Sequence, residues 1–265
     1  MFKAARWIIL IYAVLCGVFY NYQQYFYFQP KLLARNHQFT FAKNQKHEET
    51  KLAFDKETVV DIIKFLPSDT ARGIVIFFHG NRYNVEHYSS YAPYFTKHGY
   101  ECWMPDYPGY GRSTGELNVA VLEELSIQVY KMARARYATG QIIIYGKSMG
   151  TGLAAYLAAK RDCRDLILET PYYSLSSLTG NYLFFLPVHL LLKYNLETRK
   201  YFKDITAPIT ILHGAKDELI PVTNAASLLP YMKENDAFYI LPEGRHNNLP
   251  RYPLYQSVID SIMSR

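Results

Sequence analysis

Residues 141–160 read QIIIYGKSMGTGLAAYLAAK, and this stretch decides the fold. An apolar run rich in isoleucine is followed by Gly-Lys-Ser-Met-Gly at 146–150 and then by an alanine-rich stretch typical of a helix. The order predicts a strand, a sharp turn that carries Ser148, and a helix. Glycine at both ends of the turn removes side chains that would clash where strand and helix cross. The serine hydroxyl would then point away from the sheet, as a nucleophile requires.

Strand-like and helix-like segments alternate on both sides of this motif. The continuous apolar run at 73–78 is typical of a strand buried on both faces. The expected strands cover residues 58–66, 73–78, 101–105, 141–145, 165–168, 208–212 and 237–241. The expected helices cover residues 86–98, 117–137, 151–160, 225–232 and 252–263. This alternation predicts a mostly parallel, doubly wound α/β sheet over residues 57–265, with 58–66 as its edge strand.

One stretch interrupts the alternation. Residues 171–204 separate two expected strands by far more than a short loop. We interpret this stretch as a short helical cap inserted over the site, with Phe184, Phe185, Leu186, Leu190 and Leu191 as its apolar cover. One ordinary crossover helix with a longer loop is the alternative.

The N-terminal residues 1–30 are expected to form a signal anchor or transmembrane segment. Residues 7–30 carry no charge, and as a helix residues 7–28 would reach about 33 Å, against a bilayer core of about 30 Å. A cleaved signal peptide remains open, although no small-x-small cleavage site follows cleanly. A soluble core helix also remains open, although the segment has no polar face.

The flanking charges do not fix the orientation of this segment. Lys3 and Arg6 precede it, and Lys31, Arg35 and Lys43 follow closely on its other side. Positive charge on both flanks leaves the side of the membrane open. Residues 31–56 are polar and charged after the anchor, and are predicted to form a linker into the first strand.

Bulk composition limits the classes of function. A chain of 265 residues suits one large α/β domain. Its net charge of +6 is spread along the chain, so no nucleic-acid-binding stripe is expected. A weak attraction to an anionic membrane surface is expected from the same charge. Cys16, Cys102 and Cys163 form no Cys-x-x-Cys pair, so neither a disulfide framework nor a zinc site is predicted.

Two side chains downstream of Ser148 could activate its hydroxyl. A serine needs a base, usually a histidine, which a carboxylate orients. Asp217 follows the expected strand at 208–212, and His246 follows the strand at 237–241. Both would lie at the carboxyl ends of strands, where ligands bind in such sheets. The chain order serine, aspartate, histidine fits this arrangement.

Other titratable residues compete for these roles. Glu169, just past the strand at 165–168, is the serious alternative acid, and Glu218 adjoins Asp217 but is expected to point elsewhere. His213 ends a strand and is expected to be structural. The remaining candidate histidines are those of the cap and of an early helix: His189, His87 and His98.

A reaction at an acyl carbon also needs two N–H groups for the oxyanion. Met149 directly follows the serine at the start of a helix, whose dipole favours negative charge there. The second donor is expected from the loop after the strand at 73–78, where the sequence reads Phe-His-Gly-Asn at 78–81. The backbone N–H of Asn81 is therefore the predicted partner of the Met149 N–H.

These motifs carry a resemblance to a known family. They are the stretches at 78–81, 106–113 (DYPGYGRS), 146–150 and 213–217 (HGAKD). From about Thr58 to its C-terminus the chain resembles the α/β-hydrolase superfamily, and looks like its membrane-anchored serine hydrolases. That group includes monoacylglycerol and lysophospholipid lipases and protein depalmitoylases. The resemblance implies that Ser148 is the nucleophile, Asp217 the acid and His246 the base, with no metal or organic cofactor.

The expected function is therefore cleavage of a carboxylic ester or thioester through an acyl-enzyme. Two apolar segments, the anchor and the cap, favour a lipid-like or acylated substrate at a membrane. A serine peptidase or an acyltransferase with the same three residues is the alternative, because fold alone does not fix the substrate. A non-catalytic binding protein on this fold is a further alternative.

Overall fold

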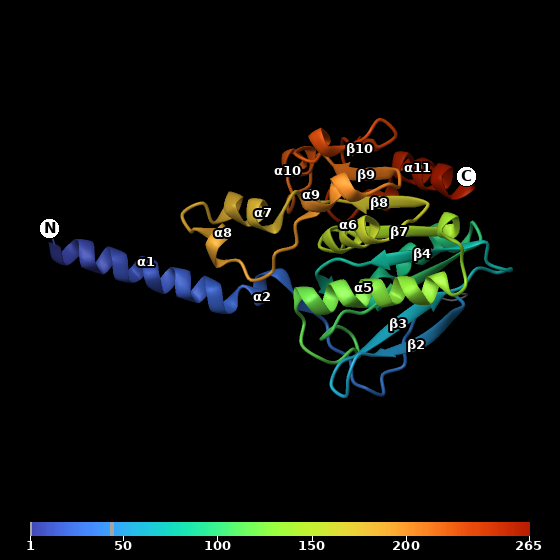
Figure 1. Cartoon of the computed structure of the whole chain (residues 1–265), viewed down its shortest axis with the longest axis horizontal. Coiled ribbons are helices and arrows are strands. Elements are labelled where there is room, and N and C mark those ends of the chain that lie inside the picture. Colours follow the sequence, from blue (N-terminus) through green and yellow to red (C-terminus); the bar gives the residue numbers. More distant parts are fainter. Residues whose placement is uncertain (1, 43–44) are drawn as a thin grey trace.

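An eight-stranded sheet forms the centre of the computed structural model, which describes residues 2–42 and 45–265 (Figure 1). Its spatial order is β10-β9-β8-β7-β4-β6-β3-β2. The pairs from β10 to β6 are parallel, and only β3 and β2 join antiparallel. The strands are β2 (His47–Ala53), β3 (Val59–Phe65), β4 (Gly73–Phe78), β6 (Tyr100–Pro105), β7 (Ile142–Lys147), β8 (Asp165–Glu169), β9 (Ile209–Gly214) and β10 (Ala237–Leu241). The predicted mostly parallel α/β sheet is confirmed.

Helices cover both faces of this sheet and bury it. Strand β4 is fully buried, as its continuous apolar sequence predicts. One core contains side chains of α5 (Val119–Arg134) and α6 (Gly150–Lys160), and the other contains side chains of α4 (Ala92–Thr96) and α11 (Pro253–Ser264). The other helices are α1 (Phe2–Tyr22), α2 (Gln24–Tyr27), α3 (Val85–Tyr88), α7 (Leu175–Tyr182), α8 (Val188–Leu191), α9 (Thr198–Tyr201) and α10 (Val222–Ala226). Short 3-10 helices span Ser89–Tyr91, Thr139–Gln141, Phe202–Asp204, Leu229–Tyr231 and Leu249–Arg251.

The expected linker at 31–56 is wrong in its second half. Strand β2 lies within it and pairs with the whole of β3, from His47 opposite Phe65 to Ala53 opposite Val59. Consequently β2, and not the strand expected at 58–66, is the edge strand on this side of the sheet. Edge strands are often charged on their open side, so β2 resembles a linker in sequence. Residues 43–44 of the expected linker lie outside the described residues.

The N-terminal helix α1 extends away from the sheet (Figure 1). Residues Lys3–Tyr22 are long and apolar enough to cross a membrane by length and composition. Most of its apolar side chains are exposed, among them Trp7, Ile8 and Ile9. Its last turns differ, because Phe19 is buried against Leu186 and Val188. Residue 1 of the expected anchor lies outside the described residues.

The insertion between β8 and β9 divides into two parts. Helix α9 and the 3-10 helix at Phe202–Asp204 pack on α6, as a crossover connection would. Helices α7 and α8 stand apart from the sheet, and α8 contacts α1 (Figure 1). Residues 171–204 therefore contain both structures that the sequence left as alternatives.

Candidate active site

The turn at Ser148 joins β7 to α6 in a strained conformation. Ser148 has a φ of 51°, in the left-handed region that non-glycine residues rarely adopt. A Cβ on Gly146 would lie 2.6 Å from the Gly150 carbonyl oxygen, and one on Gly150 would collide with the backbone oxygens of Phe78 and His79. The two glycines thus allow helix α6 to cross directly over β7 and β4. The serine side chain is left at the carboxyl edge of the sheet.

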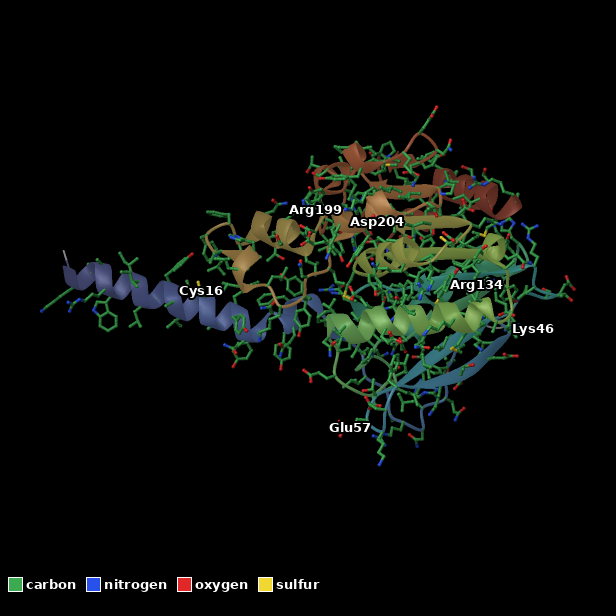
Figure 2. The ribbon with its side chains drawn as sticks, in the orientation of Figure 1. Cys16, Lys46, Glu57, Arg134, Arg199 and Asp204 are labelled. Atoms are coloured by element: carbon green, nitrogen blue, oxygen red, sulfur yellow. The ribbon has the colours of Figure 1, made fainter. Side chains whose placement is uncertain are left out.

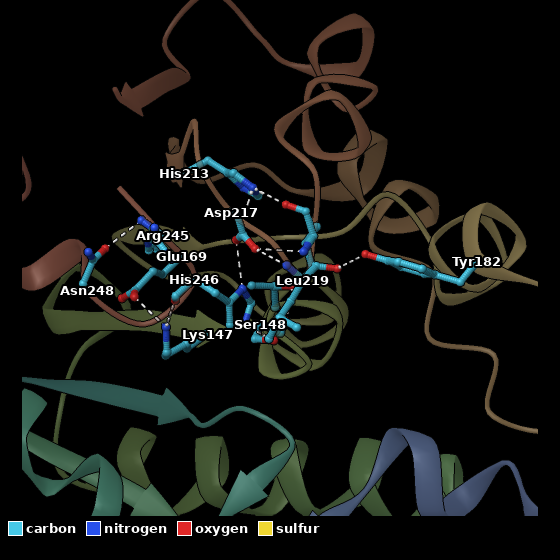
Figure 3. Close-up of polar contacts among 12 residues, drawn as sticks. Lys147, Ser148, Glu169, Tyr182, His213, Asp217, Leu219, Arg245, His246 and Asn248 are labelled. Atoms are coloured by element: carbon cyan, nitrogen blue, oxygen red, sulfur yellow. Dashed lines mark hydrogen bonds and ion pairs between the residues drawn. The ribbon is translucent and has the colours of Figure 1, made fainter. Parts of the chain in front are cut away.

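Three side chains meet in a hydrogen-bonded line at this edge (Figure 3). The Ser148 hydroxyl lies 3.0 Å from Nε2 of His246, whose Nδ1 lies 2.8 Å from Oδ2 of Asp217. Because a carboxylate only accepts, Nδ1 carries the proton and Nε2 accepts from the serine. All three residues are buried. The structure therefore brings together the three residues that the sequence singled out.

Asp217 is held by its own loop as well as by the histidine. Its Oδ1 accepts hydrogen bonds from the backbone N–H groups of Leu219 (2.9 Å) and Ile220 (2.8 Å). Burial acts to raise its pKa, but the hydrogen bond and charge of His246 and these two N–H groups together hold the pKa of Asp217 below its ordinary value. The carboxylate is thus kept charged and aimed at Nδ1 of His246.

His213 also stabilises the loop that carries Asp217. It is fully buried at the end of β9, and its Nε2 donates to the backbone oxygen of Ile220 at 2.9 Å. Burial lowers its pKa, which favours the neutral form of the ring. Since its Nε2 is engaged with the loop, His213 has the structural place that the sequence suggested.

Glu169 is committed to a buried network rather than to the ring of His246 (Figure 3). Its carboxylate accepts from Nζ of Lys147 at 2.7 Å, and three tyrosine hydroxyls surround it, those of Tyr91, Tyr145 and Tyr255. Lys147 also donates to the backbone oxygen of His246 at 2.9 Å. The ion pair therefore connects the end of β8 to the loop that carries the histidine.

Sequence reasoning missed this network. Its one visible signal is a lysine in the otherwise apolar run of β7. The partner of this lysine, Glu169, is apparent only from the register of β7 and β8, in which the two residues lie opposite each other. Of the other competing residues, Glu218, His87 and His189 are exposed, and His98 binds Asp260 on α11 at 2.8 Å.

The two predicted oxyanion donors flank Ser148. Among the described residues, neither the Met149 N–H nor the Asn81 N–H donates to a protein acceptor. His79 uses Nδ1 to donate to the Gly80 oxygen at 2.7 Å, which fixes the plane of the peptide that bears the Asn81 N–H. A Cβ on Gly80 would lie only 3.6 Å from the Cβ of Ser148. The loop therefore passes close to the serine.

A cavity of about 350 Å³ opens beside this group. Ser148, Met149, Asn81 and His246 line one part of it, and the rest is mainly apolar. Its further lining residues come from the cap, from the loops after β8 and β9, from the N-terminal segment and from β5 (Arg82–Tyr83): Tyr172, Leu175, Leu178, Thr179, Tyr182, Leu183, Leu219, Ile220, Phe19, Phe26, Tyr27, Gln29 and Arg82. Pockets of this size hold small organic ligands.

The cap covers the cavity with other residues than the sequence suggested. Helix α7 supplies the lining, whereas Phe184 and Leu190 are 84% and 73% exposed. Phe185 is also exposed, and Leu186 is buried against Phe19 of α1. The expected apolar cover at 184–191 thus faces solvent and the N-terminal helix, because the chain turns away from the site after α7. In the described ranges, 2–42 and 45–265, no group of three or more His, Cys, Asp or Glu residues could hold a metal ion.

Comparison with known proteins agrees with this architecture. A model of the family described as serine aminopeptidase, S33, matches residues 69–196. The Mycobacterium tuberculosis protein Rv2307c is 25% identical over 54% of this chain and 52% of its own length, so the chain matches about half of that relative. Protein bem46 of Schizosaccharomyces pombe is 25% identical over 77% of this chain and 72% of its own.

Solved structures show the same fold. The esterase Pf2001 of Pyrococcus furiosus superposes with a TM-score of 0.70 at 17% identity, over 90% of this chain and 97% of the esterase. The structure has the α/β-hydrolase fold, so the fold implied by the resemblance of its motifs is confirmed.

Proposed function

We propose that this α/β-hydrolase is a serine hydrolase that cleaves carboxylic esters or thioesters of lipid-like or acylated substrates. The hydrogen-bonded line of Ser148, His246 and Asp217, beside an apolar cavity, is the observation that carries the proposal. The position of Ser148 beside the backbone N–H groups of Met149 and Asn81 supports a reaction at an acyl carbon. The apolar lining supports a hydrocarbon chain as the acyl group.

The reaction follows from the hydrogen bonds. Ser148 Oγ attacks the carbonyl carbon while its proton passes to Nε2 of His246. Asp217 stabilises the resulting imidazolium, and the N–H groups of Met149 and Asn81 bind the oxyanion. The C–O or C–S bond then breaks, and the imidazolium gives its proton to the leaving alcohol or thiol. Water attacks the acyl-serine with His246 as base, releasing the acid and restoring the serine.

A peptidase with the same three residues is the second candidate, favoured by the family model that matches residues 69–196. An aminopeptidase must accept the α-ammonium group of its substrate. The lining of the cavity includes Arg82, a cation that would repel such a group. An ester or thioester with an apolar acyl chain fits this lining better. An acyltransferase would differ only in replacing water with another acceptor.

Active-site labelling tests the serine. We expect a fluorophosphonate probe to modify the wild-type protein and to leave Ser148→Ala unlabelled. Ser257→Ala is the matched control, because this exposed serine lies on α11, outside the site, and that variant should label fully. Equal labelling of Ser148→Ala would refute the assignment. Absence of labelling in the wild type would favour a non-catalytic binding protein.

A substrate panel separates the remaining alternatives. Wild-type protein should hydrolyse p-nitrophenyl esters and thioesters faster than aminoacyl amides. Faster cleavage of the amides would favour the peptidase. Transfer of the acyl group to an added alcohol, in preference to water, would favour the acyltransferase.

A further inference from the structure

The N-terminal segment does not leave the domain where α1 ends. Strand β1 (Gln29–Pro30) pairs in parallel with β5 (Arg82–Tyr83), and the Gln29 N–H donates to the Asn81 oxygen at 2.8 Å. The Arg82 side chain donates to Oε1 of Gln29 at 2.7 Å. The chain that follows the helix is therefore attached to the loop that carries the predicted oxyanion donor.

Gln23 attaches the end of α1 to the cap. Its side chain is fully buried, and its Nε2 donates to the backbone oxygens of Leu191 (2.9 Å) and Tyr20 (3.1 Å). Its Oε1 accepts from the Lys193 N–H at 2.8 Å. A buried amide whose groups are all engaged holds its neighbours in one arrangement, since leaving any of them unpaired is costly.

Apolar and hydroxyl contacts extend this attachment along the cap. Phe19 is buried against Leu186 and Val188. The Tyr27 hydroxyl lies 2.6 Å from that of Thr179 on α7. Cys16, one turn before Phe19, lies beside the cap and away from the sheet (Figure 2). The seam between α1, α2 and the cap is thus a packed interface.

The cavity beside Ser148 reaches this seam. Phe19, Phe26, Tyr27 and Gln29 are part of its lining, together with residues of α7. A group that enters from Ser148 and runs along the cavity therefore meets the N-terminal segment on one side and the cap on the other. In a protein with this segment removed, the cavity would lack that side.

We propose that residues 19–29 form a wall of the acyl-chain site, with Phe19 limiting the length of chain that it accepts. The inference rests on the proposed hydrolysis of acyl substrates, and adds that the apolar N-terminal segment is part of the binding site. Phe19 suits this place because it lines the same cavity as Ser148 and is buried where α1 meets the cap, against Leu186 and Val188. Each methylene that gains or loses burial should change kcat/KM by about fourfold.

Chain-length profiles test the wall. The full-length protein in detergent micelles is assayed with p-nitrophenyl esters from acetyl to palmitoyl. We expect Phe19→Ala to move the preferred chain to greater length, and Phe19→Trp to move it to shorter length. Val18→Ala is the matched control, because Val18 neighbours Phe19 but is 50% exposed, and its profile should equal that of the wild type. Profiles of both Phe19 variants that coincide with the wild type, with unchanged melting temperatures, would overturn the proposal.

A second readout separates this proposal from the proposed hydrolysis. A long-chain fatty acid with a diazirine at its terminal carbon is bound to the full-length protein and irradiated. Peptides that contain residues 19–29 should carry the label, and excess unlabelled fatty acid should remove it. Label at these residues without ester hydrolysis would refute the hydrolase and support the wall. Hydrolysis with label confined to other residues would refute the wall and keep the hydrolase.

Discussion

At the scale of single residues, two carboxylates near His246 have different surroundings. Asp217 accepts a hydrogen bond from the Nδ1–H of His246, whereas Glu169 forms an ion pair with Lys147. We therefore expect Asp217→Asn to lower kcat/KM by about 10³–10⁴-fold without loss of fold, because the amide favours the wrong tautomer of the histidine. Circular dichroism and ester hydrolysis measure the two quantities.

Glu169→Gln is the matched comparison. It leaves the charge of Lys147 buried without its partner, which should cost about 3–5 kcal/mol of unfolding free energy. The ring of His246 keeps its partner, so kcat/KM should fall much less than in Asp217→Asn. If Glu169→Gln instead removes activity while Asp217→Asn retains it, the acid assignment moves to Glu169.

The pH profile follows from the same group of residues. The lowered pKa of Asp217 favours its charged form in the weakly acidic range, and the lowered pKa of His213 favours the neutral form of that ring. A histidine base works only when neutral. Protonation removes the base, so kcat/KM should decrease as the pH falls from 8 to 5. A flat profile over this range would argue against a histidine base.

At the scale of elements, the cap has an inner and an outer surface. Leu178 on α7 lines the cavity, whereas Phe184, in the turn after α7, is exposed. We expect Leu178→Ser to reduce the preference for long acyl chains over acetyl in an ester panel. Phe184→Ser is the control and should change neither that preference nor the melting temperature. A changed preference in Phe184→Ser alone would place the chain against the outer surface of the cap.

Local chemistry explains which elements were predictable. The turn at Ser148 could be predicted because its glycines are required by contacts within a few residues of it and with the neighbouring strand. Strand β2 could not, because its pattern is set by an exposed edge rather than by burial. The contact of Lys147 with Glu169 depends on the register of two strands, which neither strand specifies alone.

At the scale of the whole molecule, the sequence predicted the architecture better than the attachment of its N-terminus. The alternation of strands and helices was enough for the sheet. The packing of residues 19–30 on the cap and on the loop at 81–83 joins segments far apart in the sequence, so no local pattern indicated it. The catalytic roles of Ser148, Asp217 and His246 stay predictions until the variants are measured.

Membrane extraction tests whether α1 spans a membrane. Because Lys3–Tyr22 has the length and composition of a membrane span, we expect full-length protein to remain in the membrane pellet after a carbonate wash. The mass of the retained protein should include residues before Phe19. Release of uncleaved protein into the supernatant would refute the span, and loss of the first residues from the retained chain would indicate cleavage.

The attachment of α1 at Gln23 has a mechanical consequence. A helix that crosses a bilayer changes its tilt when the thickness of the hydrocarbon layer changes. Here the end of such a helix is clamped to the cap and continues into a strand beside Asn81. Tilting would therefore be transmitted as a displacement of two sides of the cavity. The rate of ester hydrolysis in such a molecule would depend on the thickness of the surrounding membrane. The helix would then anchor the domain and also change the shape of its cavity.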